Sequence, residues 1–438
     1  MRKKILLSNF VAVAAFLQTG MLLIESCSKK NDSPGLQISS FVPSSAAKDS
    51  IVIISGKNFG LSVAGITVSF NGVAGSVLTA NDSVLTVKVP VHAHDGKITV
   101  QANGKTGNSV GNFTYIYTVS TLAGDGTGAF KNGTGTAAEF NYPSGVAADA
   151  FGNIYVGDVN NNQIRKITSG GTVSTLAGDG TRAYKDSTGI LAQFDNPYGI
   201  ATDGSGNVYV ADRSNQRIRK ITPAGVVTTL AGNSTAGYKD STGKLAQFDY
   251  PQGVAADGSG NVYVSDEYNH RIRKITPAGA VSTLAGDGTA AYKEGTGTLA
   301  QFYYPHGVAT DGSGNVYVAD TENQRIRKIT TSGVVSTLAG NGRYGYKDSI
   351  GAMAQFNYPA ALAVDASGNV YVADSYNNRI RKITPAGAVS TVAGDGTGAY
   401  KDGAGAIAQF NYPSSIAVDG FGNIYVADTN NNRIRKIE

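Results

Sequence analysis

Short runs in which apolar and polar residues alternate, separated by glycine-rich turns, fill most of this chain. Alternation with a period of two is typical of β-strands that bury one face. Within one representative stretch the expected strands are 198–203, 207–211, 217–222 and 226–231. The turns between them include Gly-Ser-Gly at 204–206 and Pro-Ala-Gly at 223–225, and these are residues that tight turns favour. The pattern predicts a unit of four short antiparallel strands.

This unit recurs six times at a fixed step of 54 residues. The tripeptide Leu-Ala-Gly, or Val-Ala-Gly in the last copy, begins at Leu122, Leu176, Leu230, Leu284, Leu338 and Val392. A proline and an aspartate keep the same step, from Pro143 to Pro413 and from Asp158 to Asp428. Four short strands per unit, at a period near 50 residues, are typical of a β-propeller. The repeats therefore predict an all-β fold with six blades.

The order of strands at the two ends of the repeat array predicts how the ring closes. A fourth-strand pattern at 119–123 precedes the first full repeat, and the last repeat ends with a third strand at 433–437. We expect the N-terminal strand to complete the last blade as its outer strand. Ladder hydrogen bonds, each contributing about 0.5–1.5 kcal/mol, would hold this closure. Closure also removes a long exposed sheet edge.

Three short motifs in the repeat carry a family resemblance. They are Pro-x-Gly-Val-Ala, Gly-Asn-Val-Tyr-Val-Ala-Asp and Asn-His-Arg-Ile-Arg-Lys, the last of them at 269–274. Together they resemble the NHL repeat over residues 119–438, and the resemblance implies a six-bladed propeller domain at 118–438. Because the Asp and Arg residues of these motifs recur in the blades, we interpret them as an Asp–Arg or Asp–backbone tie between strands rather than as a ligand site.

The segment before the repeats reads as a separate small β-domain. Alternating runs predict strands at 50–55, 65–70, 84–89 and 97–102. The motifs at 41–43, 56–60 and 113–115 resemble the immunoglobulin-like IPT/TIG domain, which implies a β-sandwich at 36–117 that acts as a spacer or a partner-contact domain. We expect His92 and His94 to form an exposed loop pair, because a metal site needs more ligands than these two.

The first 35 residues read as an export signal and a tether. Residues 2–4 are basic, an apolar stretch follows at 5–24, and Ser26 and Cys27 come next, which is the layout of a secretory signal. Residues 1–26 resemble a bacterial lipoprotein signal, although Glu25 departs from that pattern. The resemblance implies lipidation of Cys27, a polar tether at 27–35 and a stable membrane anchor at the outer membrane or cell surface. The alternative is a plain signal peptide followed by an unrelated cysteine.

Composition narrows the classes of partner and reaction. The 37 Lys and Arg against 32 Asp and Glu leave a formal net charge of +5, too small to indicate a nucleic-acid partner. Cys27 is the only cysteine, which excludes an internal disulfide. The repeats contain only His270 and His306, which excludes a three-His zinc site, and His270 takes a place that Asn or Gln holds in the other copies, so we expect it to be structural. We expect a monomer with no metal and no cofactor.

Differences between the repeats gather on one face of the predicted disc. Successive loops of a four-stranded blade alternate between two faces, so the long loop before the first strand shares a face with the loop between the second and third strands. Residues after the recurrent Pro and Asp vary on this long-loop face, whereas the turns on the opposite face, the turn face, are mostly uniform. The candidate ligand-binding residues are Tyr198, Gln252, His306, Arg213, Glu267, Tyr268, Glu322 and Tyr376.

Side chains that differ around a channel mouth are able to recognise an asymmetric ligand. The tyrosines among them offer stacking faces, and the other candidates offer directional hydrogen bonds. The sequence favours a non-catalytic binding or scaffold protein of the cell envelope, with a glycan or a surface protein as its ligand. One alternative is a lyase or hydrolase with a carboxylate-based site at Glu267 and Glu322. The other is neutral drift on a solvated rim.

Overall fold

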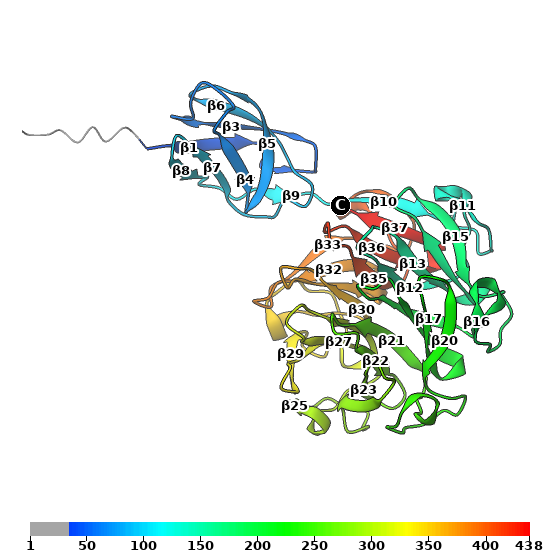
Figure 1. The fold of residues 1–438 in the computed structure, drawn as a ribbon. Helices are drawn as coiled ribbons and strands as arrows, with labels where there is room; N and C mark the ends of the chain where they lie inside the picture. The colour runs from blue at the N-terminus through cyan, green and yellow to red at the C-terminus, as the bar shows by residue number, and fades with distance from the viewer. Residues whose placement is uncertain (1–34) are drawn as a thin grey trace, which may run out of the picture.

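The computed structural model describes residues 35–438, which form a β-sandwich followed by a β-propeller (Figure 1). The expected signal peptide at 1–26, Cys27 and all but the last residue of the expected tether lie outside the described residues. The described part contains strands and short 3-10 turns but no α-helix, and none of its helical segments is long and apolar enough to cross a membrane. The all-β fold class predicted from the sequence is confirmed.

The sandwich domain contains nine strands. They are β1 (Gln37–Val42), β2 (Ser45–Ala46), β3 (Ile51–Lys57), β4 (Thr67–Phe70), β5 (Val73–Ala80), β6 (Val84–Lys88), β7 (Ile98–Ala102), β8 (Lys105–Asn108) and β9 (Thr114–Tyr115). Seven pair in the order β1-β3-β6-β5-β4-β7-β8, and β2 pairs in parallel with β9. The alternation in β3 buries Val52 and Ile54 and exposes Ile51 and Ile53, as a sheet with one buried face requires.

The propeller consists of six antiparallel blades, numbered here in chain order. Each blade runs from an inner strand at the channel to an outer strand at the rim. Blades 1 to 3 are β12 (Pro143–Ala148), β13 (Ile154–Asp158), β14 (Gln163–Ile167) and β15 (Thr172–Ala177); β17 (Pro197–Thr202), β18 (Val208–Asp212), β19 (Arg217–Ile221) and β20 (Val226–Ala231); β21 (Pro251–Ala256), β22 (Val262–Asp266), β23 (Arg271–Ile275) and β24 (Val281–Ala285). Blades 4 to 6 are β26 (Pro305–Thr310), β27 (Val316–Asp320), β28 (Arg325–Ile329) and β29 (Val334–Ala339); β30 (Pro359–Val364), β31 (Val370–Asp374), β32 (Arg379–Ile383) and β33 (Val389–Ala393); β35 (Pro413–Val418), β36 (Ile424–Asp428), β37 (Arg433–Ile437) and β10 (Thr118–Ala123).

The long loops add elements that the sequence pattern did not predict. In four blades a two-residue strand pairs outside the outer strand: β11 (Gly133–Thr134), β16 (Ser187–Thr188), β25 (Gly295–Thr296) and β34 (Gly403–Ala404). Each loop then makes one 3-10 turn: η1 (Gly135–Ala137), η3 (Gly189–Leu191), η5 (Gly243–Leu245), η6 (Gly297–Leu299), η8 (Gly351–Met353) and η10 (Gly405–Ile407). The loop then returns to the channel and buries the Ala and the Phe of its Ala-x-Phe segment, as with Ala138 and Phe140. The loop is thereby fixed against its blade.

The ring closes as the sequence predicts. Strand β10 pairs antiparallel with β37, with Val119 opposite Ile437 and Thr121 opposite Arg435. The backbone N–H of Thr118 donates to the carbonyl of Glu438 at 2.8 Å. Figure 1 shows the N-terminal strand of the propeller (cyan) beside the C-terminal strands (red). The last blade is therefore assembled from both ends of the domain.

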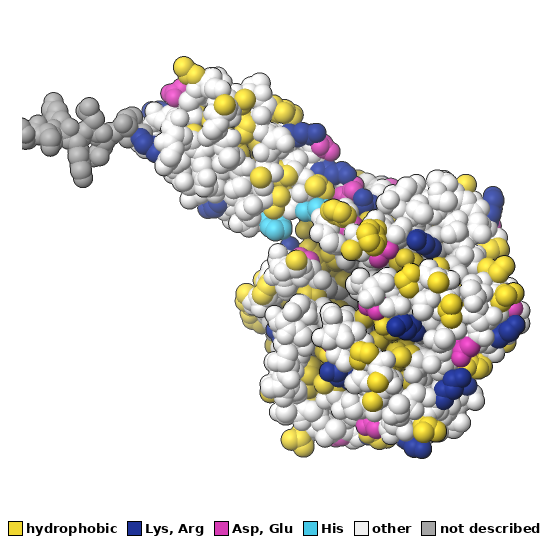
Figure 2. Space-filling view, viewed as in Figure 1, with side chains coloured by type: hydrophobic (Ala, Val, Ile, Leu, Met, Phe, Trp, Pro, Cys, Tyr) yellow, Lys and Arg dark blue, Asp and Glu magenta, His cyan; other side chains and the backbone are white. Residues whose placement is uncertain are grey.

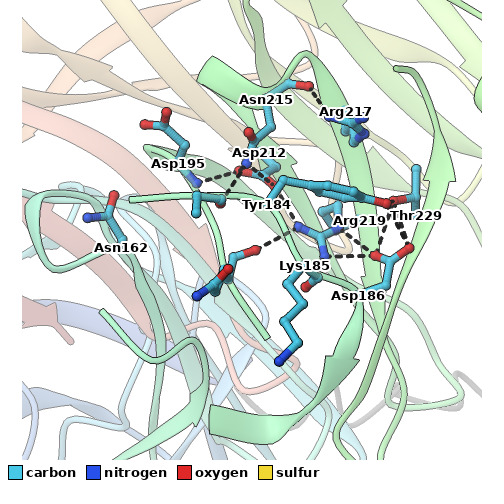
Figure 3. A network of polar contacts seen from close by, with 12 residues as sticks. Asn162, Tyr184, Lys185, Asp186, Asp195, Asp212, Asn215, Arg217, Arg219 and Thr229 are labelled. Carbon is cyan, nitrogen blue, oxygen red and sulfur yellow. Dashed lines mark hydrogen bonds and ion pairs between the residues drawn. The ribbon is translucent and has the colours of Figure 1, made fainter. Parts of the chain in front are cut away.

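Buried Asp–Arg pairs tie the second strand of each blade to the third. The six pairs, from Asp158–Arg165 to Asp428–Arg435, have nitrogen-to-oxygen distances of 2.6–2.7 Å and side chains that are 0% exposed. Figure 3 shows the pair of blade 2, where Arg219 also donates to Asp186 of the long loop at 2.8 Å. The ring of Tyr184, in the same loop, lies over this guanidinium. The predicted structural role of the recurrent Asp and Arg residues is confirmed.

The sandwich domain contacts the turn face of the last two blades. Lys48 forms an ion pair with Glu438, and the ring of His92 packs against Gly422 in a turn of blade 6. His94 lines the cleft between the two domains, and histidine side chains are visible at this junction in Figure 2. Both histidines are only partly exposed, so the expectation of an exposed loop pair is wrong: they lie at the junction with the propeller. The long-loop face remains open.

Candidate functional site

A depression of about 320 Å³ lies in the long-loop face at the mouth of the central channel. It is lined by Tyr142, Val159, Asn160, Asn196, Tyr198, Arg213, Gln252, Glu267, His306, Tyr358 and Tyr412. These residues precede the recurrent proline, follow it, or belong to the loop between the second and third strands. The narrower channel beneath, about 70 Å³, is lined by the inner strands and shares Tyr198, Gln252 and His306 with the depression. The six blades thus contribute different side chains to one concave site.

Three of the five tyrosines that directly precede the recurrent proline, Tyr142, Tyr358 and Tyr412, form part of the wall. Tyr358 and Tyr412 have φ values of 58° and 56°, a left-handed conformation that a non-glycine residue keeps only when its surroundings hold it. The preceding blade does so, because the N–H of Tyr358 donates to Gln324 Oε1 at 2.7 Å and that of Tyr412 donates to Asn378 Oδ1 at 3.0 Å. In the same way, Nδ1 of His270 accepts a hydrogen bond from the backbone N–H of Tyr304 at 3.2 Å, which confirms the structural role expected for His270.

A buried ion network from three adjacent blades forms another part of the wall. Arg213 follows β18, Glu267 follows β22, and His306 is the second residue of β26. Arg213 Nη2 donates to Glu267 Oε2 at 3.0 Å, and His306 Nε2 lies 3.3 Å from Glu267 Oε1. Glu267 and His306 are 6% and 5% exposed, and the side chain of Arg213 is 22% exposed. Both carboxylate oxygens of Glu267 are therefore engaged.

The network keeps Glu267 ionised. Burial acts to raise the pKa of Glu267, but the contact with His306 and the charge of Arg213 outweigh burial and lower this pKa below its usual range. The reverse holds for Arg213. Burial acts to lower the pKa of Arg213, but the charge of Glu267 and the hydrogen bond to it outweigh burial and raise this pKa above its usual value. The paired charges cancel, so the network contributes no net charge from Arg213 and Glu267 to the depression.

The tyrosines of the depression are neutral hydrogen-bonding groups. Burial raises the pKa of Tyr198 to about 12. Burial likewise raises the pKa of Tyr358 and of Tyr412, so all three phenols keep their protons at neutral pH. Gln252 is 6% exposed, and among the described residues its Oε1 atom has no hydrogen-bond partner. Phenol edges and an amide oxygen are thus available to a ligand.

The structure brings five of the eight candidate residues into the depression and leaves three outside it. Tyr198, Gln252, His306, Arg213 and Glu267 line it together. The other three are not part of its lining: Tyr376 stacks on Tyr358 with ring centroids 4.6 Å apart, Tyr268 packs against Tyr250 and Tyr304, and Glu322 accepts a hydrogen bond from Tyr344 at 3.1 Å. Sequence reasoning missed Tyr142, Tyr358 and Tyr412. Their signal was a tyrosine before the recurrent proline in five of the six copies.

The arrangement suits recognition better than acid–base chemistry. A general acid or base needs a titratable group that faces the reacting atoms, whereas Glu267 uses both oxygens to hold Arg213 and His306. Over residues 35–438, no group of three or more His, Cys, Asp or Glu side chains is placed to hold a metal ion. What the depression presents is aromatic faces, phenol hydroxyls and amides. Groups of these kinds are suited to stacking and to neutral hydrogen bonds.

Comparisons with known proteins agree with this architecture. The NHL repeat matches at 140–167, 194–221, 248–275, 302–329, 356–383 and 410–437, and the IPT/TIG domain matches at 36–117. Protein SUPPRESSOR OF QUENCHING 1, chloroplastic, from Arabidopsis thaliana is 29% identical over 318 residues, which cover 68% of this chain and 30% of that protein. The chain therefore matches less than a third of the length of this curated relative.

Two solved structures from Bacteroides thetaiotaomicron share the fold. A structural genomics protein of unknown function has a TM-score of 0.63 at 22% identity, covering 93% of this chain and 99% of that one. An auxiliary nutrient binding protein has a TM-score of 0.58 at 20% identity, covering 93% and 98%. At such identities the likeness concerns the fold alone. The chain is thus an IPT/TIG domain followed by a six-bladed β-propeller of NHL repeats.

Proposed function

We propose that this protein is a non-catalytic module of the cell envelope that binds a glycan in the depression of the long-loop face. The observation that carries the proposal is a concave site in which neutral polar groups stand among aromatic faces. Sugars present C–H faces that stack on aromatic rings and hydroxyls that exchange hydrogen bonds with phenols and amides. Ligand sites of this size commonly combine apolar walls with a few placed polar groups.

Two further observations support this role. An auxiliary nutrient binding protein shares the fold, which is consistent with a binding rather than a catalytic propeller. The export-like segment before Cys27 supports secretion and a lipid anchor at the outer membrane or cell surface. Because the sandwich domain contacts the turn face, a monomer held by such an anchor keeps its long-loop face accessible to a large ligand.

The carboxylate-based enzyme is less well supported. A hydrolase or lyase built on Glu267 and Glu322 needs both carboxylates in one site. Glu267 is buried between Arg213 and His306, while Glu322 is outside the depression and bound to Tyr344.

A glycan array tests the proposal. The probe is the chain from residue 28 onward, which contains every described residue. A variant in which Tyr198, His306 and Tyr376 are changed to Ala removes two rings that line the depression and a third that stacks on the lining residue Tyr358. Phe151→Ala is the matched control, because Phe151 is an aromatic side chain 81% exposed on the turn face of blade 1. Binding that the triple variant loses and the control keeps supports the proposal; no bound glycan would shift the assignment to a protein ligand.

A further inference from the structure

A cluster of four tyrosines lies beside the depression on blades 3 and 4. Tyr250 and Tyr304 precede the recurrent prolines of these blades, Tyr303 precedes Tyr304, and Tyr268 follows Glu267 in the loop between β22 and β23. Ring centroids are 4.9 Å apart for Tyr250–Tyr268, 5.2 Å for Tyr268–Tyr304 and 5.1 Å for Tyr303–Tyr304. Tyr268 and Tyr303 are 43% and 36% exposed. We call this set the tyrosine track.

The tyrosine track is continuous with the depression. The guanidinium carbon of Arg213, a lining residue, lies 4.6 Å from the ring centroid of Tyr250. Glu267, which also lines the depression, is the chain neighbour of Tyr268. A ligand that occupies the depression could therefore extend onto the exposed rings of Tyr268 and Tyr303 while staying in contact with the protein along its length.

The fold does not require the two exposed rings of the track. The position of Tyr303 is Asn or Asp in the other copies: Asn141, Asp195, Asp249, Asn357 and Asn411. The backbone N–H at this position donates to the recurrent Asp in either case, at 2.9 Å for Tyr303 and 2.8 Å for Asn141. The position of Tyr268 is likewise Asn160 in blade 1 and Asn430 in blade 6. Blades thus fold with asparagine at both places, and the rings on blades 3 and 4 are an addition to the scaffold.

We propose that the ligand is an oligosaccharide, with one sugar in the depression and the following sugars stacked along the tyrosine track. This inference rests on the proposed function and defines the ligand as a chain. The exposed rings of Tyr268 and Tyr303 extend the contact surface beyond the depression, so a ligand longer than a single sugar is needed to cover both. Every ring of the track is a phenol, whose hydroxyl edge and apolar face match a sugar chain better than an apolar peptide.

Isothermal titration calorimetry with ladders of cello-, malto-, manno- and xylo-oligosaccharides, from the monosaccharide to the hexasaccharide, tests the inference. The double variant Tyr268→Asn with Tyr303→Asn introduces residues that other blades already carry, so its fold is preserved. For the ladder that binds, affinity rises with chain length in the native protein, and the double variant loses at least about fivefold on long chains while keeping its affinity for the shortest binder.

Two results overturn the inference, and they are distinguishable from each other. A ladder that binds with the same affinity at every length, or a double variant that binds long chains as tightly as the native protein, refutes the track but leaves glycan binding in the depression intact. Absence of binding to all four ladders and to every glycan of the array refutes the proposed function itself, and the track with it.

Discussion

Replacing Glu267 by Gln tests whether this buried carboxylate holds the wall of the depression together. The substitution keeps the shape of the side chain and removes its charge. Arg213 then keeps its positive charge at a site where its side chain is 22% exposed, and His306 loses an ionised neighbour 3.3 Å away. Removing one partner of a buried ion pair leaves the other without compensation, so we expect a loss of stability rather than a neutral change.

The contacts set the size of this loss. A hydrogen bond to a charged group contributes about 1.5–3 kcal/mol, and Glu267 makes two charged contacts. The amide that replaces the carboxylate would retain one carbonyl oxygen and hence one contact in weaker form, and water reaches part of the Arg213 side chain, which reduces the penalty. We therefore expect the Glu267→Gln variant to lower the free energy of unfolding by about 1.5–3 kcal/mol.

Urea unfolding followed by tyrosine fluorescence measures the change, since the chain has 23 Tyr and no Trp. Glu322→Gln is the matched control: Glu322 occupies the equivalent loop of the next blade, is half-buried and accepts one hydrogen bond, from Tyr344. The control should stay within about 0.5 kcal/mol of the native protein. Equal unfolding midpoints for the two variants would refute the view that the Arg213–Glu267–His306 network supports the site.

Three further predictions concern pH, binding and closure. Because the folded-state pKa of Glu267 lies below its usual range, its stabilising contribution should be complete above the ordinary Glu pKa of about 4.3 and be lost as the pH falls through the folded value. Urea midpoints of the native protein and of Glu267→Gln, measured against pH, should therefore converge in acid, and a difference between them that is as large in acid as at neutral pH contradicts this. Tyr358→Ala should weaken glycan binding several-fold through the lost ring face, as titration calorimetry would show, whereas unchanged affinity would place the sugar elsewhere. Val119→Ala, in the closing strand, and Val173→Ala, in the identical sequence Thr-Val-Ser-Thr-Leu-Ala of blade 1, remove valines 3% and 2% exposed. Backbone hydrogen exchange should accelerate more in β37 of the Val119→Ala variant than in β14 of the Val173→Ala variant. The reason is that β15 is joined to its partner β14 by a short turn, whereas β10 is not joined to its partner β37 by one. Equal acceleration in the two variants would contradict this.

The sequence was sufficient for the architecture because the blades repeat. Each copy independently indicates the same strands, so the strand boundaries of one blade apply to the others. The strand at 119–123 could then pair only with the strand at 433–437, which lacked an outer neighbour. The Asp212–Arg219 tie followed from recurrence in the same way. The short outer strands such as β11 were missed because two residues carry no alternation that a pattern can detect.

The candidate site was predictable only in part, because its contacts join residues from different blades. Glu267 reads from the sequence as an exposed loop residue, and it is buried only because Arg213 and His306 approach it from neighbouring blades. Tyr358 recurs before the proline like a scaffold residue, and its ring turns into the depression through a left-handed backbone that Gln324 of the preceding blade holds. Tyr376 stacks on Tyr358, a contact between two residues of blade 5 that no pattern in the sequence indicates.

The most direct test of the account is a crystal structure of the chain from residue 28 onward, soaked with the strongest glycan of the array. We predict sugar density in the depression, stacked on Tyr358 and within hydrogen-bond reach of Gln252, with any following sugars over Tyr268. Sugar density on the turn face or on the sandwich domain, with the depression unoccupied by sugar, would contradict the assignment of the long-loop face as the binding site.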